Sequence, residues 1–178
     1  MFFRHLWKPL IVFGCSLMIP GLSHATVAEQ LSIEELRDQS SFVVRAHVVD
    51  RYVVETRGPK GEIYTQVELR ASQYLHGDGP RVLLVQQLGG QLDGVTMHLE
   101  GNAEFQVGTE VVAFLDHDPL TGTSYVVGLA QGMFVVHSVA GTEWLTRDLE
   151  GIAFYSVGAR PYNLVHSLMR FMHLSERL

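Results

Sequence analysis

The sequence predicts a mainly β protein: a small antiparallel barrel or sandwich with a short N-terminal helix and a C-terminal amphipathic helix. Two observations carry this fold class. Between Phe42 and Phe154, apolar and polar residues alternate with period two in runs rich in β-branched and aromatic residues. Clusters of Gly, Pro and Asp separate these runs, and the connections are too short for crossover helices.

The first 25 residues have the features of a secretory signal peptide. Basic residues precede an apolar stretch from about residue 10 to residue 22, and Ser-His-Ala follows at 23–25. Small residues at positions 23 and 25 suit signal peptidase, so we expect cleavage between Ala25 and Thr26. The apolar stretch is shorter than the ~20 residues that span a bilayer. We therefore expect a secreted or periplasmic protein with no membrane span after cleavage.

Cleavage there would leave 153 of the 178 residues, which suits a single β-rich domain at 26–178. The lost segment holds Arg4 and Lys8 but no acidic residue, so the formal charge changes from −6 to −8. This charge argues against a nucleic-acid partner, because such binding depends mainly on Lys and Arg.

The only cysteine, Cys15, would leave with the signal peptide. The mature chain would then have no disulfide, no thiol nucleophile and no cysteine-ligated zinc. Residues 12–15 loosely resemble a lipobox, so lipidation of Cys15 is an open alternative.

A helix is predicted at about 32–39, where Ser32 and Glu35 have the spacing of a capping box. Leu31 and Leu36 flank this pair as a hydrophobic staple. A second helix should open at residues 160–163 and carry an apolar stripe of Leu164, Leu168, Phe171 and Met172.

Strands are predicted between these two helices. A single bent strand at 42–54 forms a hairpin with the strand at 63–71, in which alternate residues from Ile63 to Ala71 share a face. The further strands expected are 81–88, 94–99, 109–116, 123–129, 132–138, 143–146 and 152–156.

The pair Gly89-Gly90 lies between two predicted strands. A phosphate-binding glycine loop leads into a helix, whereas residues 91–99 return to strand periodicity. Glycine within strands marks bends, bulges and close backbone approaches. We therefore interpret Gly89 and Gly90 as the point where one strand bends into the next.

Other candidate chemistry lacks a supporting pattern. His47, His98 and His137 lie in different predicted strands and would converge only by folding, and no His-Glu-x-x-His occurs. Asp116 and Asp118 have a calcium-loop spacing without the remaining ligands of an EF-hand. Gly-x-Ser-x-Gly is also absent. The sequence therefore assigns no catalytic residue, no metal ligand and no cofactor.

An ordered series of short segments resembles a group of uncharacterised secreted bacterial proteins. The series spans about residues 31–136 and comprises SSFVVRAHV (40–48), GEIYTQVEL (61–69), YLHG (74–77), QLGG (87–90), FQVGTEVVAFL (105–115) and GLAQGMF (128–134). The resemblance brings no catalytic residues with it.

The first half of the series also looks like the netrin-like, OB-type barrel of the tissue inhibitors of metalloproteinases. Those inhibitors chelate zinc through an N-terminal cysteine, whereas this mature chain would begin at Thr26. The leading hypothesis is a non-enzymatic binding module for an extracellular or periplasmic protein, with His98, Glu100 and Gln131 as candidate binding residues. The alternatives are an inhibitor of a secreted metalloprotease, and a hydrolase with a site at His98 and Glu100. The oligomeric state stays open.

Overall fold

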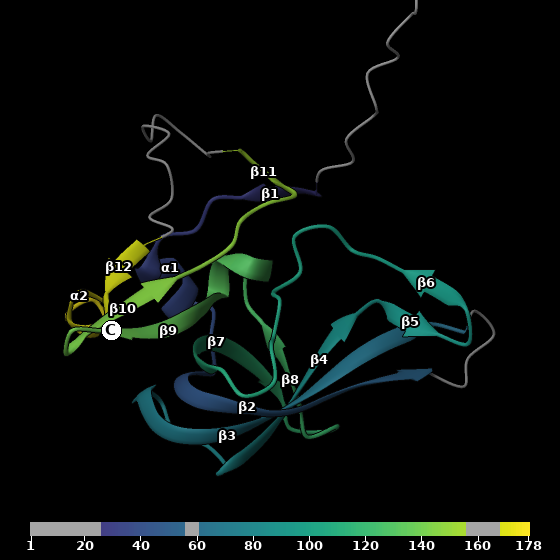
Figure 1. The fold of residues 1–178 in the computed structure, drawn as a ribbon, viewed down its shortest axis with the longest axis horizontal. Coiled ribbons are helices and arrows are strands. Elements are labelled where there is room, and N and C mark those ends of the chain that lie inside the picture. The colour runs from purple at the N-terminus through teal and green to yellow at the C-terminus, as the bar shows by residue number, and fades with distance from the viewer. Residues whose placement is uncertain (1–25, 56–60, 156–167) are drawn as a thin grey trace, which may run out of the picture.

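The computed structural model describes residues 26–55, 61–155 and 168–178, which form a mainly β fold as the sequence predicts (Figure 1). The proposed signal peptide lies outside the described residues. The helices are α1 (Ile33–Asp38), the 3-10 helix η1 (Leu129–Gly132) and α2 (Phe171–Ser175). The strands are β1 (Thr26–Glu29), β2 (Phe42–Glu55), β3 (Ile63–His76), β4 (Val82–Leu88), β5 (Gly90–Leu92), β6 (Val95–Met97), β7 (Glu110–Asp118), β8 (Thr123–Val126), β9 (Met133–Val139), β10 (Thr142–Thr146), β11 (Ile152–Tyr155) and β12 (Leu168–Arg170).

Five of these strands form a ring-like sheet in the order β2, β3, β4, β8 and β7. Neighbouring strands are antiparallel except at the β4–β8 pair, where Leu84 and Val85 lie parallel to Thr123 and Ser124. The pairing of β7 with β2 then closes the ring. Beyond β7 the sheet continues through β9 and β10 to β12 (Figure 1).

Two apolar clusters lie on opposite sides of β2 and β7. Val44, Ala46 and Val48 of β2 belong to the cluster inside the ring, which also holds Phe105 from the loop before β7. Val43 belongs to the second cluster, together with residues of α1, β9, β10 and α2. Because both faces of these strands are buried, β2 and β7 are the centre of the fold.

Helix α1 begins with the predicted capping box. The Ser32 hydroxyl accepts from the Glu35 amide at 3.2 Å, and the Glu35 carboxylate accepts from the Ser32 amide at 2.8 Å. The apolar face of the helix buries Ile33 and Leu36 in the second cluster. This local prediction is confirmed.

A β-bulge at Val49 changes which side chains of β2 face inward. Val48 pairs with Leu69 and Asp50 pairs with Glu68, so Val49 has no partner on β3. The backbone of Val48 is also held by hydrogen bonds to Gly108 and Thr109. One extra residue reverses the alternation of a strand. The inward positions therefore shift from the even-numbered residues, ending at Val48, to Arg51 and Val53.

Three expected elements differ in the structure. The single strand expected at 94–99 is the second half of a hairpin, β5–β6, whose two-residue loop is Asp93-Gly94 with φ of 48° and 82°. Asp-Gly favours this loop because both positions need positive φ. The strand expected at 123–129 ends at Val126, and η1 follows.

The C-terminal helix is the third difference. Leu168–Arg170 forms β12, which pairs with β10, and helix α2 covers only Phe171–Ser175. The residues expected to open this helix, 160–163, lie outside the described residues, as does Leu164. Pairing with an available sheet edge overrides the helical pattern at 168–170, since periodicity is only a local signal.

Candidate functional site

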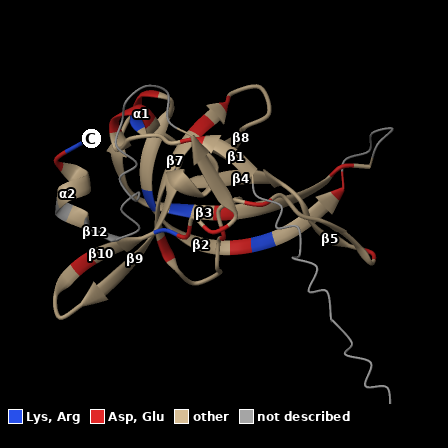
Figure 2. Cartoon of the chain, turned by 90° about the horizontal axis from the view of Figure 1, so that it is seen from above, with Lys and Arg blue, Asp and Glu red and all other residues tan. Residues whose placement is uncertain are grey.

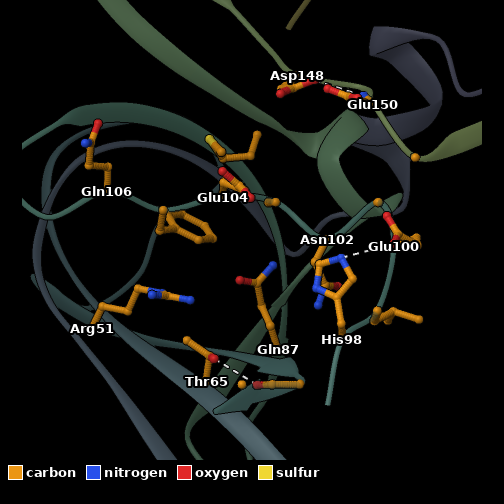
Figure 3. A pocket seen from close by; sticks show the side chains of 18 of the residues that line it. Arg51, Thr65, Gln87, His98, Glu100, Asn102, Glu104, Gln106, Asp148 and Glu150 are labelled. Carbon is orange, nitrogen blue, oxygen red and sulfur yellow. Dashed lines mark hydrogen bonds and ion pairs between the residues drawn. The ribbon is translucent and has the colours of Figure 1, made fainter. Parts of the chain in front are cut away.

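A large open pocket lies at one end of the ring, with a volume of about 1530 Å³ (Figure 3). Its floor is formed by the inward residues of β2, β3 and β4, including Arg51, Thr65 and Gln87. The β5–β6 hairpin and the loop at 98–106 line a second side. Residues of β9 and β10 and the segment 148–152 line a third.

Charged residues are unevenly placed in this pocket. Arg51 lies on one side, and Asp148 and Glu150 lie on the opposite side in Figure 3. Glu100 and Glu104 also line the pocket. Figure 2 shows acidic residues at many loops and strand ends over the whole molecule, with a few basic residues among them. The pocket thus has one guanidinium facing several carboxylates.

The Val49 bulge and the double glycine position the floor. In the cross-strand row Val53, Thr65 and Gln87, the three residues share the inner face of the sheet. The Thr65 hydroxyl donates to the carbonyl of Gly89 at 2.8 Å, and the Gly89 amide donates to Ile63 at 2.8 Å. These two hydrogen bonds attach the bend at Gly89 to β3 at the floor of the pocket.

Gly89 and Gly90 form the bend that the sequence predicts. Gly89 has φ of 108° and separates β4 from β5, and a Cβ there would lie 2.9 Å from the backbone oxygen of Met97. Such a close approach of two backbones requires glycine. The structural interpretation of this pair is confirmed.

The loop at 98–106 is anchored to the core. Ala103 and Phe105 are buried in the ring, and the side-chain amide of Asn102 donates to the carbonyl of Leu88 at 2.7 Å. Gly101 accepts a hydrogen bond from Ala130 of η1 at 2.9 Å. The loop is therefore a fixed wall of the pocket.

Two of the three candidate binding residues meet at this wall. Nε2 of His98 lies 3.3 Å from Oε1 of Glu100, and the two side chains are 66% and 41% exposed. Both residues line the pocket (Figure 3). Their contact leaves them accessible to a ligand.

Gln131 is placed elsewhere. It is fully buried, and its amide bonds three backbone groups: Oε1 accepts from Leu31 at 2.9 Å, and Nε2 donates to Glu29 at 2.9 Å and to Gly128 at 3.1 Å. Gln131 thus joins the N-terminal segment to η1. This side chain has no hydrogen-bonding group left for a ligand.

Arg51, Gln87 and Asn102 are pocket residues that the sequence analysis missed. In a strand with unbroken alternation from Val44, Arg51 falls on the outer face. The bulge at Val49 depends on the pairing with β3, so β2 alone carries no clear signal of it. Only the inward position of Gln87 follows from local alternation with the buried Leu83 and Val85.

The three strand histidines do not converge. Each histidine has a different neighbour. Nδ1 of His47 lies 4.0 Å from Oε1 of Glu110, and His98 contacts Glu100. Nε2 of His137 lies 2.7 Å from Oγ1 of Thr146. Within the described ranges, no group of three or more His, Cys, Asp or Glu side chains has a metal-binding arrangement.

The Asp116–Asp118 segment has the hydrogen bonds of a tight turn. Asp118 accepts from the Leu120 amide at 2.8 Å and from the Thr121 hydroxyl at 2.9 Å, and these bonds lower the pKa of Asp118. Nδ1 of His117 lies 3.1 Å from the Ser124 hydroxyl. Ser124 is fully buried, so a substrate cannot reach this serine and histidine pair.

The chain was compared with protein families, curated proteins and solved structures. No protein-family model, curated protein or solved structure matches the chain. Among the residues that the structure describes, no helix is long and apolar enough to cross a membrane.

Proposed function

We propose that the protein is a secreted or periplasmic binding module that holds an extended polypeptide segment of a partner protein in the pocket. The observation that carries this proposal is a large pocket on a floor of paired strands, lined by polar side chains that are accessible to a ligand. Sites for ligands combine a preformed concave surface with a few placed polar groups.

The lining favours a polypeptide over other ligands. Gln87, Gln91, Asn102 and Gln106 supply side-chain amides, which both donate and accept hydrogen bonds as peptide groups do. The aromatic residue of the lining, Phe105, is buried in the core. Nucleic-acid bases need exposed aromatic faces for stacking, and the charge of the chain also opposes nucleic acid.

The proposed barrel type rests on the strand order. The ring runs β2, β3, β4, β8, β7, with one parallel pair between the third and fifth of these strands along the chain. A five-stranded Greek-key arrangement of this kind supports the OB-type barrel suggested by the resemblance to netrin-like inhibitors. The fold alone does not identify a ligand.

A library of random peptides displayed on phage tests the function. The protein would be expressed with residues 1–25, and mass spectrometry of the purified product would show whether it begins at Thr26 in the periplasm or medium. Enrichment of peptides on the wild type supports a polypeptide ligand, and failure to enrich any peptide contradicts it.

Two neighbouring glutamines supply matched variants. Gln87→Trp places a bulky side chain on the floor of the pocket, whereas Gln86→Trp places the same side chain on the opposite face of β4, where Gln86 contacts Gln66. We expect Gln87→Trp to abolish binding of the selected peptides and Gln86→Trp to preserve it. Equal binding by both variants would place the peptide site outside the pocket.

A hydrolase is the second candidate function, and one contact favours it. His137 lies 2.7 Å from the hydroxyl of Thr146, and Thr146 lines the pocket. This distance suits proton transfer from a hydroxyl nucleophile to a base. Ester and peptide substrates would be assayed with the wild type, His137→Ala and His98→Ala. Loss of the wild-type activity in either histidine variant, at an unchanged melting temperature, supports the hydrolase. A wild type without activity contradicts it.

A further inference from the structure

Arg51 has no carboxylate partner among the described residues, unlike three other arginines of the chain. Arg37, Arg45 and Arg177 each contact a carboxylate within the same molecule. Arg51 lines the pocket, and its guanidinium has no hydrogen bond or ion pair with any described residue. The described part of the chain thus places a cation in the pocket without supplying its partner.

The side-chain amide of Gln87 is a second N–H donor close to Arg51. Gln87 lies on the same inner face, one cross-strand row from Arg51, and its side chain also lacks a hydrogen bond within the described residues. In Figure 3 the Arg51 and Gln87 side chains both point into the pocket. Together they present N–H donors to one region of the floor.

We propose that Arg51 and Gln87 bind a single carboxylate of the polypeptide held in the pocket, either an Asp or Glu side chain or a chain-terminal carboxylate. This inference rests on the proposed function. The planar guanidinium donates two parallel hydrogen bonds to a carboxylate, and the amide adds a third donor.

The other walls limit the charge of the ligand. Glu100, Glu104, Asp148 and Glu150 line the same pocket, so a polyanion such as a phosphorylated group would be repelled by several carboxylates. One carboxylate at Arg51 avoids most of this repulsion because Arg51 lies across the pocket from Asp148 and Glu150 (Figure 3). The chemistry therefore favours a carboxylate over phosphate.

The first test uses small probes and does not require a known peptide. The side-chain amide resonances of Gln87, which are present in the wild type and in both arginine variants below, would be followed by NMR while N-acetylglycine, N-acetylglycinamide or inorganic phosphate is added. We expect a saturable shift with N-acetylglycine alone, lost in Arg51→Gln and kept in Arg70→Gln, where an exposed arginine outside the pocket is changed. An equal response to N-acetylglycinamide, a stronger response to phosphate or no response overturns the inference.

The second test uses the peptides that the library yields. Each peptide would be compared with versions in which Asp or Glu is changed to the amide, and with a C-terminal amide. Arg51→Gln should weaken binding of the carboxylate form by about tenfold and leave the amide form unchanged. The version that reproduces this loss identifies the source of the carboxylate.

The outcomes separate the two proposals. Peptides that bind in the pocket regardless of Arg51 and of their own carboxylates would overturn the carboxylate subsite and leave the binding function intact. A shift by N-acetylglycine without any selected peptide would support the subsite and contradict a polypeptide ligand.

Discussion

Arg147 and Gln131 are joined by a short buried hydrogen bond: Nη1 of Arg147 donates to the backbone carbonyl of Gln131 at 2.6 Å. The guanidinium also lies over the ring of Phe134, 4.8 Å from its centroid. Burial lowers the pKa of Arg147 to about 10. This contact fixes the end of β10 against η1, and the neighbouring pocket residues Thr146 and Asp148 are held in place with it.

Gln131→Met should therefore destabilise the fold. The substitution keeps the volume but removes the side-chain partner of the Leu31 amide and of the Glu29 carbonyl, and it leaves the Gly128 carbonyl only its hydrogen bond from the backbone amide of residue 131. We expect the free energy of unfolding in urea to fall by about 3 kcal/mol. Gln106→Met, at an exposed position, is the control and should change it by less than about 0.5 kcal/mol. Similar values for both variants would contradict the assigned role of Gln131.

Stability at acid pH should depend on Arg45. Its hydrogen bonds, at 2.9 and 2.8 Å, lower the pKa of Glu110 below the ordinary 4.5. Because the folded pKa is the lower one, the contribution of Glu110 is fully present above pH 4.5 and is lost as the pH falls through the folded pKa.

Arg45→Gln is the variant that tests this dependence. We expect it to reduce the free energy of unfolding at neutral pH, and the difference from the wild type to shrink below pH 4.5. Urea titrations across this range provide the measurement, with Arg70→Gln as the control. A difference that stays constant with pH would show that the ion pair with Glu110 does not contribute.

Gly90→Val should be more destabilising than Gly94→Val. Both glycines have positive φ, at 149° and 82°, so both substitutions strain the backbone. Only at Gly90 would a Cβ also meet a neighbour, at 2.8 Å from Cγ1 of Val53, whereas nothing lies within 4 Å at Gly94.

We expect Gly90→Val to lower the free energy of unfolding by about 2 to 3 kcal/mol and Gly94→Val by about 1 kcal/mol. Thermal and urea unfolding provide the measurement. Unchanged stability of Gly90→Val combined with loss of peptide binding would instead make Gly90 a ligand-contacting residue.

Thr26→Val should loosen the N-terminal strand at the pocket edge. The Thr26 hydroxyl donates to the carbonyl of Glu100 at 2.6 Å, and its amide donates to Gly151 at 2.9 Å. The variant keeps the shape and the amide but loses the hydroxyl contact. We expect about 1 kcal/mol less protection of the β1–β11 amides in hydrogen exchange. Val27→Thr, at an exposed position, is the control; equal protection in both variants would contradict this anchoring.

Local signals determined much of the secondary structure. Ser32 and Glu35 sit within one helical turn, so the sequence contains the whole capping box. Residues 63–69 have alternate buried positions as predicted, because period two follows from the geometry of any strand. The Asp93-Gly94 hairpin signal was also present in the sequence, although the strand assignment passed over it. His98 and Glu100 are two residues apart, so their proximity could be predicted from the sequence.

Tertiary pairing alone decided the rest of the site. The bulge at Val49 exists because β2 must pair with β3 while the turn at 108–109 holds Val48, and this pairing places Arg51 in the pocket. Gln131 is buried and joins two segments because folding brings its side chain to backbone groups about a hundred residues away along the chain. Local signals in the sequence thus located α1 and most strands of the sheet between β2 and β10, whereas β1, β5 and β12 depended on pairing with other segments. Which side chains meet in the pocket depended on register and ring closure, which are set by contacts between distant segments.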